Sequence, residues 1–102
     1  MTTKIVPIDL MTAPQLAQHV AGRVRAARLR RAWTQQELAD RSGMSLSSLR
    51  RFERSGEIGF LSLVRVAVAL AAVEELAALF PEHPTSLDEL LAPRARQRGR
   101  RS

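Results

Sequence analysis

The stretch Thr34–Glu53, TQQELADRSGMSLSSLRRFE, most constrains what this 102-residue chain can fold into. Thr34, with Glu37 three residues later, has the spacing of a capping box, in which each side chain binds the other residue's backbone N–H at a helix start. Gly43 suits the end of that helix, because glycine adopts the left-handed conformation easily. Ser45 can then cap a second helix. The stretch therefore predicts two short helices joined by a tight turn.

The apolar residues of the same stretch indicate which sides of these helices are buried. Leu38 and the small Ala39 face inward on the first helix, and Met44 fills the turn. Leu49 and Phe52 return to the core at a spacing of three, which is helical. This arrangement leaves four residues of the second helix outside: Leu46, Ser47, Arg50 and Arg51.

Composition limits the chain to one domain with a modest core. With only four aromatic residues, that core consists mostly of Leu, Val and Ala, which predicts an all-α fold. The absence of cysteine excludes disulfides and zinc fingers. The longest apolar run, Val66–Val73, is too short to span a bilayer, and no secretory signal is apparent. We expect a cytoplasmic protein without a membrane partner.

The net charge of +6 is unevenly distributed. Residues 1–92 carry only +1, whereas residues 93–102 contain five arginines and no acid. Such a basic end either binds an anionic partner or is a solvated, disordered tail. Both interpretations stay open.

Further helices are expected on both sides of the central stretch. One begins near Pro14, after Thr12, with an apolar face at helical spacing: Leu16, Val20, Val24 and Ala27. Another begins at about Phe60 and is apolar nearly all round, which favours either a central position or a subunit interface. Val73–Phe80 predicts a fifth helix, and Leu87–Ala92 a short extra C-terminal helix before the tail. The β-prone run Lys4–Ile8 is either an extended arm or an edge strand, since Pro7 excludes a central strand.

These residues resemble a known family. The run VRAARLRRAWTQQELADRSGMSLSSLRRFERSG, followed by FLSLVRVAVAL, is similar to the Xre/Cro family of helix-turn-helix regulators, which have the five-helix phage-repressor fold. The continuation LAALFPEHPTSLDELLAPRARQRGRR resembles the HipB-like subgroup, antitoxins encoded beside a HipA-type kinase toxin. The implied organisation is an N-terminal arm (1–13), a DNA-binding domain (14–80), a linker with a short helix (81–93) and a basic tail (94–102).

The resemblance also implies roles for individual residues. Base-contacting side chains are expected at Leu46, Ser47 and Arg51, and a phosphate contact at Gln35. Positions suited to phosphate contact or to orienting the helix are Ser45, Ser48 and Arg54. Arg50 lies one residue round the helix from Arg51, and we expect it to contact phosphate. Arg28 and Glu53 match a pair that forms an internal salt bridge. The chain departs from the family pattern at Ala32, where glycine is usual, and at Arg54-Ser55-Gly56, where Asn-Gly often follows the position of Glu53.

The leading hypothesis is a dimeric, sequence-specific regulator that binds double-stranded DNA, and within it an autorepressing antitoxin. The alternative is a protein–protein interaction module of the same fold that does not read DNA. The presence of Gln35 and Arg51 at expected DNA-contact positions argues against it. A third interpretation, non-specific RNA or ribosome binding through the tail, does not account for the motif. An enzyme is not expected, because His19 and His83 are unpartnered and no metal-spaced or catalytic cluster is present. No cofactor or metal is expected.

Overall fold

The computed structural model describes residues 6–82, and these residues form helices and no strands. A 3-10 turn, η1 (Ile8–Leu10), precedes the five α-helices: α1 (Ala13–Arg30), α2 (Gln35–Ser42), α3 (Leu46–Ser55), α4 (Phe60–Ala69) and α5 (Val73–Ala77). The all-α, five-helix prediction is confirmed. The helix predicted at Leu87–Ala92 and the basic tail lie outside the described residues.

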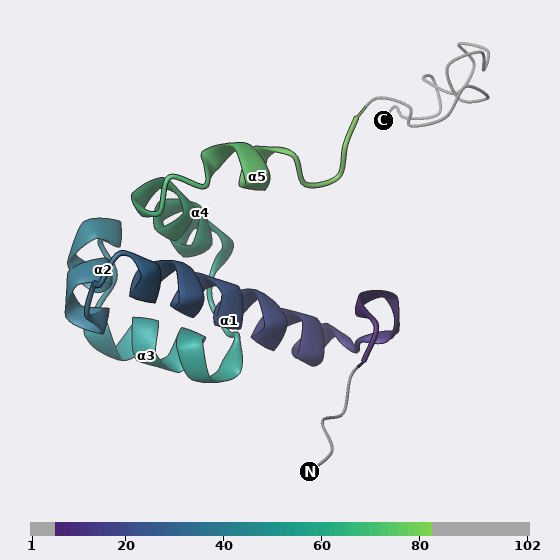
Figure 1. Ribbon diagram of the computed structural model, residues 1–102, viewed down its shortest axis with the longest axis horizontal. Helices are drawn as coiled ribbons and strands as arrows, with labels where there is room; N and C mark the ends of the chain where they lie inside the picture. Colours follow the sequence, from purple (N-terminus) through teal and green to yellow (C-terminus); the bar gives the residue numbers. More distant parts are fainter. Residues whose placement is uncertain (1–5, 83–102) are drawn as a thin grey trace.

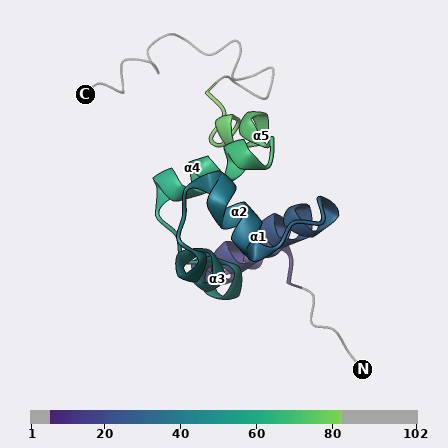
Figure 2. The ribbon, with the colours of Figure 1, turned by 90° about the vertical axis from the view of Figure 1, so that its left-hand side faces the viewer.

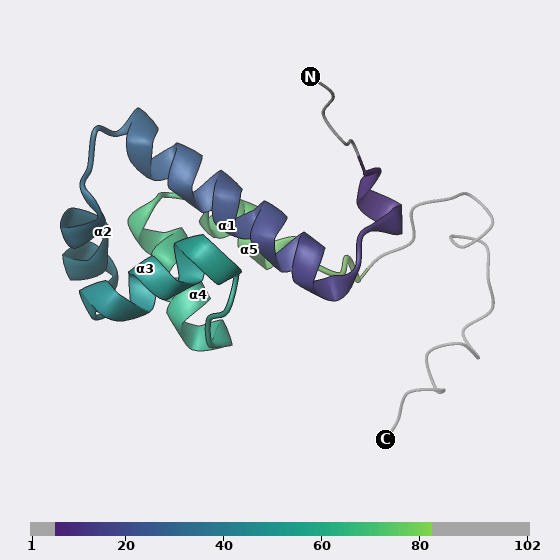
Figure 3. The same ribbon diagram turned by 90° about the horizontal axis from the view of Figure 1, so that it is seen from below.

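The long helix α1 lies along α3, with α2 packed across one end of the pair (Figure 1). Helix α4 packs against α2, and α5 packs on α4. In two of the views α5 lies on the side of α4 away from α3 (Figures 1 and 2), and Figure 3 shows the same helices from below. Helix α3 therefore borders one side of the domain, and α5 the opposite side.

The capping signals of the central stretch are all present. Thr34 and Glu37 form the reciprocal capping box of α2, with Thr34 N donating to Glu37 Oε1 over 2.7 Å and Glu37 N to Thr34 Oγ1 over 3.0 Å. Gly43 has φ +73° and ends α2 in the left-handed conformation. The Ser45 hydroxyl caps α3 by accepting from Ser48 N. Local sequence therefore fixes where both helices begin and where α2 ends.

The core lies where α1, α2, α3 and α4 meet. Its largest fully buried side chains are Phe52, Leu38, Leu49 and Val66. Met44, which was expected to fill the turn, and Trp33 are both partly buried against it. Trp33 is also covered by arginine, since the Arg41 guanidinium carbon lies 4.2 Å from its ring centroid.

The predicted apolar face of α1 is partly wrong. Leu16 and Val20 are exposed, whereas the fully buried residue of α1 facing the core is Ala21. The reason is the close approach of α1 to the end of α3, where a Cβ added to Gly56 would lie 2.7 Å from the carbonyl carbon of Ala17. Small residues permit this distance, so the larger apolar side chains of α1 lie to the side of the contact.

Two other helix ends use alanine in a conformation that favours glycine. Ala32 after α1 has φ +57°, and Ala71 after α4 has φ +58°. Each lies in a Schellman motif: Trp33 N donates to Arg28 O after α1, and Ala72 N donates to Ala67 O after α4. The turn before Trp33 therefore takes a glycine-like shape although the chain has alanine there.

Both ends of the described chain differ from the sequence-based expectation. Residues 6–8 of the β-prone run form no strand, because Pro7 precedes η1 and its carbonyl accepts from Leu10 N. Lys4 lies outside the described residues. Helix α5 ends at Ala77 rather than at the predicted Phe80, which has φ +55°. This positive φ is incompatible with a continuing right-handed helix.

Candidate nucleic-acid interface

The outward face of α3 is polar and basic. Leu49 and Phe52 are buried, so the helix turns Ser47, Ser48, Arg50, Arg51 and Arg54 to the exterior, with Leu46 half-buried at its start. Three arginines on one exposed face of a ten-residue helix form a surface suited to an anion. All three residues expected to contact bases lie on this helix.

Helix α3 is fixed by a buried ion pair to α1. Arg28 Nε donates to Glu53 Oε2 over 2.8 Å, and Arg28 Nη2 to Glu53 Oε1 over 3.0 Å. Their side chains are only 7% and 4% exposed. Arg28 Nη1 also donates to Trp33 O over 2.8 Å, so one guanidinium joins α1, the loop after it and α3. The salt bridge that the family resemblance implied is therefore present.

Gln35 extends this network to α2. Its side-chain nitrogen donates to Glu53 Oε1 over 2.9 Å, and its side-chain oxygen accepts from Arg50 Nε over 3.3 Å. The Gln35 amide therefore sets the position of α2 relative to α3 and holds the side chain of Arg50. To contact a phosphate as well, it would have to rearrange or share these bonds.

The serines at the start of α3 bond to one another. The Ser45 hydroxyl accepts from Ser48 N over 3.1 Å and donates to Ser48 Oγ over 2.8 Å. Ser45 thus orients the helix start, one of the two roles considered for it. Both hydroxyls are exposed and can also accept a bond from, or donate one to, a bound molecule.

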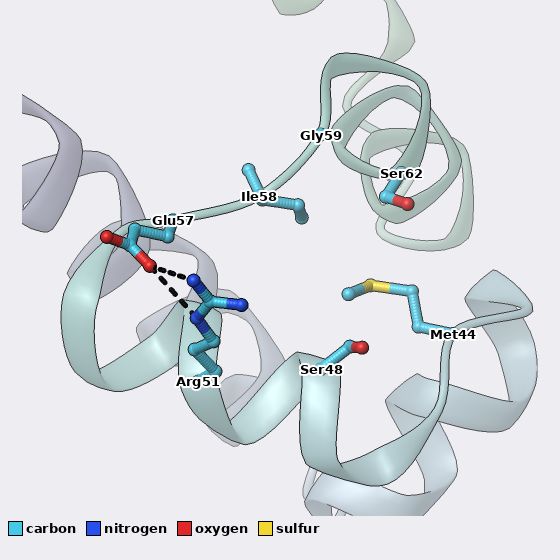
Figure 4. Close-up of a pocket in the computed structure, with 7 residues that line it drawn as sticks. All are labelled: Met44, Ser48, Arg51, Glu57, Ile58, Gly59 and Ser62. Atoms are coloured by element: carbon cyan, nitrogen blue, oxygen red, sulfur yellow. Dashed lines mark hydrogen bonds and ion pairs between the residues drawn. The ribbon is translucent and has the colours of Figure 1, made fainter.

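Arg51 forms an ion pair with Glu57 in the loop after α3, which sequence reasoning missed. Arg51 Nε donates to Glu57 Oε1 over 2.9 Å, and Arg51 Nη2 donates to the same oxygen. Figure 4 shows this pair beside a cavity of about 290 Å³ that Met44, Ser48 and Ile58 help to line. Arg51 and Glu57 are six residues apart, with Gly56 between them, so helical spacing does not predict their contact. The opposite charges of the two side chains are the one signal in the sequence that could have suggested it.

A second, apolar hollow lies between α1, α4 and α5. Its volume is about 570 Å³, and its lining includes Val20, Val24, Leu63, Leu76 and Leu79. Val20 and Leu79 of this lining are exposed, and other exposed apolar side chains occur on α4 and after α5, notably Val68 and Phe80, which is 89% exposed. No residue of α3 lines this hollow.

Residues 24–79 match the helix-turn-helix family HTH_3. No curated protein matches the chain. Among the helices of residues 6–82, none combines the length and the apolar character needed to cross a bilayer. The family match covers more than half of the chain and includes α2, the turn at Gly43 and α3. The chain therefore belongs to the HTH_3 helix-turn-helix family, and its domain is of the Xre/Cro type of DNA-binding regulator.

Proposed function

We propose that the protein is a sequence-specific transcriptional regulator that inserts α3 into the major groove of double-stranded DNA. The observation that carries the proposal is the exposed basic face of α3, held in place by the buried pair of Arg28 and Glu53. A rigid helix presenting polar side chains is what major-groove readout requires. The family match supports the same general function.

Within this proposal the outward residues divide into two groups. Arg51 can make a bidentate contact with guanine O6 and N7, Leu46 can contact a thymine methyl group, and Ser47 can bind either kind of base edge. The phosphate contacts that supply most of the affinity are assigned to the surrounding polar residues, Gln35, Ser45, Ser48, Arg50 and Arg54. Arg50 and Gln35 are already bonded to each other, so they would contact the backbone as a unit.

The protein is proposed to act as a homodimer in which a second copy covers the apolar hollow between α1, α4 and α5. Exposed apolar side chains cluster there, and large patches of this kind mark interaction sites. Because α5 and α3 are on opposite sides of α4, this contact would leave both recognition helices free (Figure 2). Two helices related by a two-fold axis would contact half-sites about 34 Å apart.

The narrower proposal is an autorepressing antitoxin that binds a HipA-like kinase toxin. It rests on the sequence resemblance of residues 76–101, most of which lie outside the described residues. The neighbouring open reading frame tests it: a kinase-like product that inhibits growth, and whose toxicity this chain relieves on co-expression, would support it. A neighbour that is harmless, or toxic in the presence of this chain, would remove the antitoxin role.

Selection of bound duplexes from a random pool tests DNA reading itself. We expect an enriched sequence with two-fold symmetry and a footprint covering two half-sites. If the protein enriches no sequence, the interaction-module interpretation replaces this proposal. If it enriches a single half-site and sediments as a monomer at saturating concentration, the dimer is wrong and DNA reading stands.

A further inference from the structure

We propose that Glu57 is a positioning residue for Arg51 and thereby helps to determine which base pair α3 selects. The inference rests on the proposed DNA-reading function. It concerns the ion pair between the last exposed turn of α3 and the loop that follows, a contact within this chain (Figure 4).

The geometry of the pair leaves the guanidinium able to read guanine. An arginine has five N–H donors. Glu57 occupies the edge formed by Nε and Nη2, through a single carboxylate oxygen. The opposite end, formed by Nη1 and the second hydrogen of Nη2, still offers two parallel donors. Two parallel donors are what guanine O6 and N7 accept, so Glu57 orients Arg51 without blocking it.

The loop that carries Glu57 is itself held in place. Ser55 Oγ donates to the backbone oxygen of Arg51 over 2.7 Å and accepts from Glu57 N over 3.2 Å. Gly56 has φ +85°, and its backbone lies so close to Ala17 of α1 that a Cβ would collide with it. Gly56 N also donates to Phe52 O over 2.7 Å. The Glu57 carboxylate is therefore carried by a turn that is hydrogen-bonded to α3 and packed closely against α1.

This anchoring explains why an exposed ion pair can matter here. Arg51 and Glu57 are 63% and 62% exposed, and a pair so exposed adds little to stability. Its effect on DNA binding is different in kind. The carboxylate restricts the guanidinium to one orientation before binding, so that less side-chain freedom is lost when Arg51 contacts guanine. Its negative charge also repels the phosphate backbone, but this repulsion weakens binding to every sequence alike. The restricted orientation is therefore the effect that favours the correct base.

A double-mutant cycle on Arg51 and Glu57 tests the inference. The ligands are the selected operator and the same duplex with the base pair read by Arg51 replaced. We measure the ratio of the two affinities at one salt concentration for the full chain, for Glu57→Ala, for Arg51→Ala and for the double variant. Glu57→Ala should lower the ratio about 1.4- to fivefold, the fold-change that corresponds to the free energies measured for exposed ion pairs. In the Arg51→Ala background, the same change should leave the ratio unaltered.

Two further variants separate positioning from charge. Glu57→Gln keeps an oxygen acceptor but no charge, and should lower the ratio by less than Glu57→Ala does. Glu74→Gln removes one negative charge from α5 and should leave the ratio unchanged. Unfolding midpoints of all variants should match the wild type, because both residues of the pair are exposed.

The outcomes distinguish this inference from the proposed function. An unchanged ratio in Glu57→Ala, or an equal fall in both Arg51 backgrounds, overturns the role of Glu57 while DNA reading stands. A selected operator with no base pair that depends on Arg51 also overturns it. A failure to select any operator overturns the proposed function, and the inference with it.

Discussion

Replacing Glu53 by alanine should strongly destabilise the domain, because its side chain is only 4% exposed and is the partner of a buried arginine. Arg28 is only 6% exposed, and the substitution leaves its guanidinium with Trp33 O as its remaining partner and the Gln35 side-chain nitrogen without its acceptor. Arginine cannot lose its proton to escape this state. Breaking a buried pair in this way costs about 3–5 kcal/mol. The whole domain is expected to be stable by about 5–15 kcal/mol, so the loss is a large fraction of the total.

Urea unfolding followed by Trp33 fluorescence and circular dichroism measures this loss. Glu57→Ala is the matched control, because it removes the same side chain from an exposed pair and should cost about 0–1 kcal/mol. Replacing both buried partners, with Arg28→Met and Glu53→Leu, should recover part of the loss, since no unpaired charge then remains. A Glu53→Ala protein whose free energy of unfolding is within about 1 kcal/mol of the wild type would refute the reasoning.

Three further substitutions, at positions where the backbone has a positive φ, are tested by the same unfolding measurement. Gly43→Ala should cost only the conformational strain of about 1–2 kcal/mol, because nothing lies within 4 Å of the added Cβ. Gly56→Ala should cost about 1–3 kcal/mol more, because its Cβ would meet Ala17; equal losses would contradict the close helix contact. Ala32→Gly should stabilise by about 0.5–1 kcal/mol, since relief of strain at φ +57° exceeds the added chain entropy. A destabilised Ala32→Gly protein would show that alanine is unstrained in this turn.

Much of the fold follows from local signals in the sequence. Thr34 with Glu37, Gly43 and Ser45 identify the ends of α2 and the start of α3 by their own hydrogen bonds and backbone preference, which act within a few residues. Leu49 and Phe52 are buried as their spacing predicts. These predictions succeed because the information is contained in neighbouring residues.

The features that the sequence did not predict depend on how separate parts of the chain come together. Hydrophobic periodicity predicted that the larger apolar side chains of α1 face the core. Because Gly56 approaches Ala17 closely, the face of α1 that lies nearest to α3 carries small residues instead. The hydrogen bond between Gln35 and Glu53 joins residues 18 positions apart, and no local sequence pattern predicts it. The pairing of Arg51 with Glu57 depends on the course of the chain through Gly56, which sequence alone does not specify.

The central claim is that α3 reads base sequence through Arg51. The most direct test compares Arg51→Ala with the wild type on the selected operator and on random duplex DNA at the same salt concentration. We expect a loss of about 1–3 kcal/mol on the operator and little on random DNA. Arg54→Ala, an exposed arginine of the same helix assigned to phosphate, is the control and should weaken binding to both DNAs alike. An Arg51→Ala protein that loses equally on both would contradict the claim and return the interaction-module interpretation to consideration.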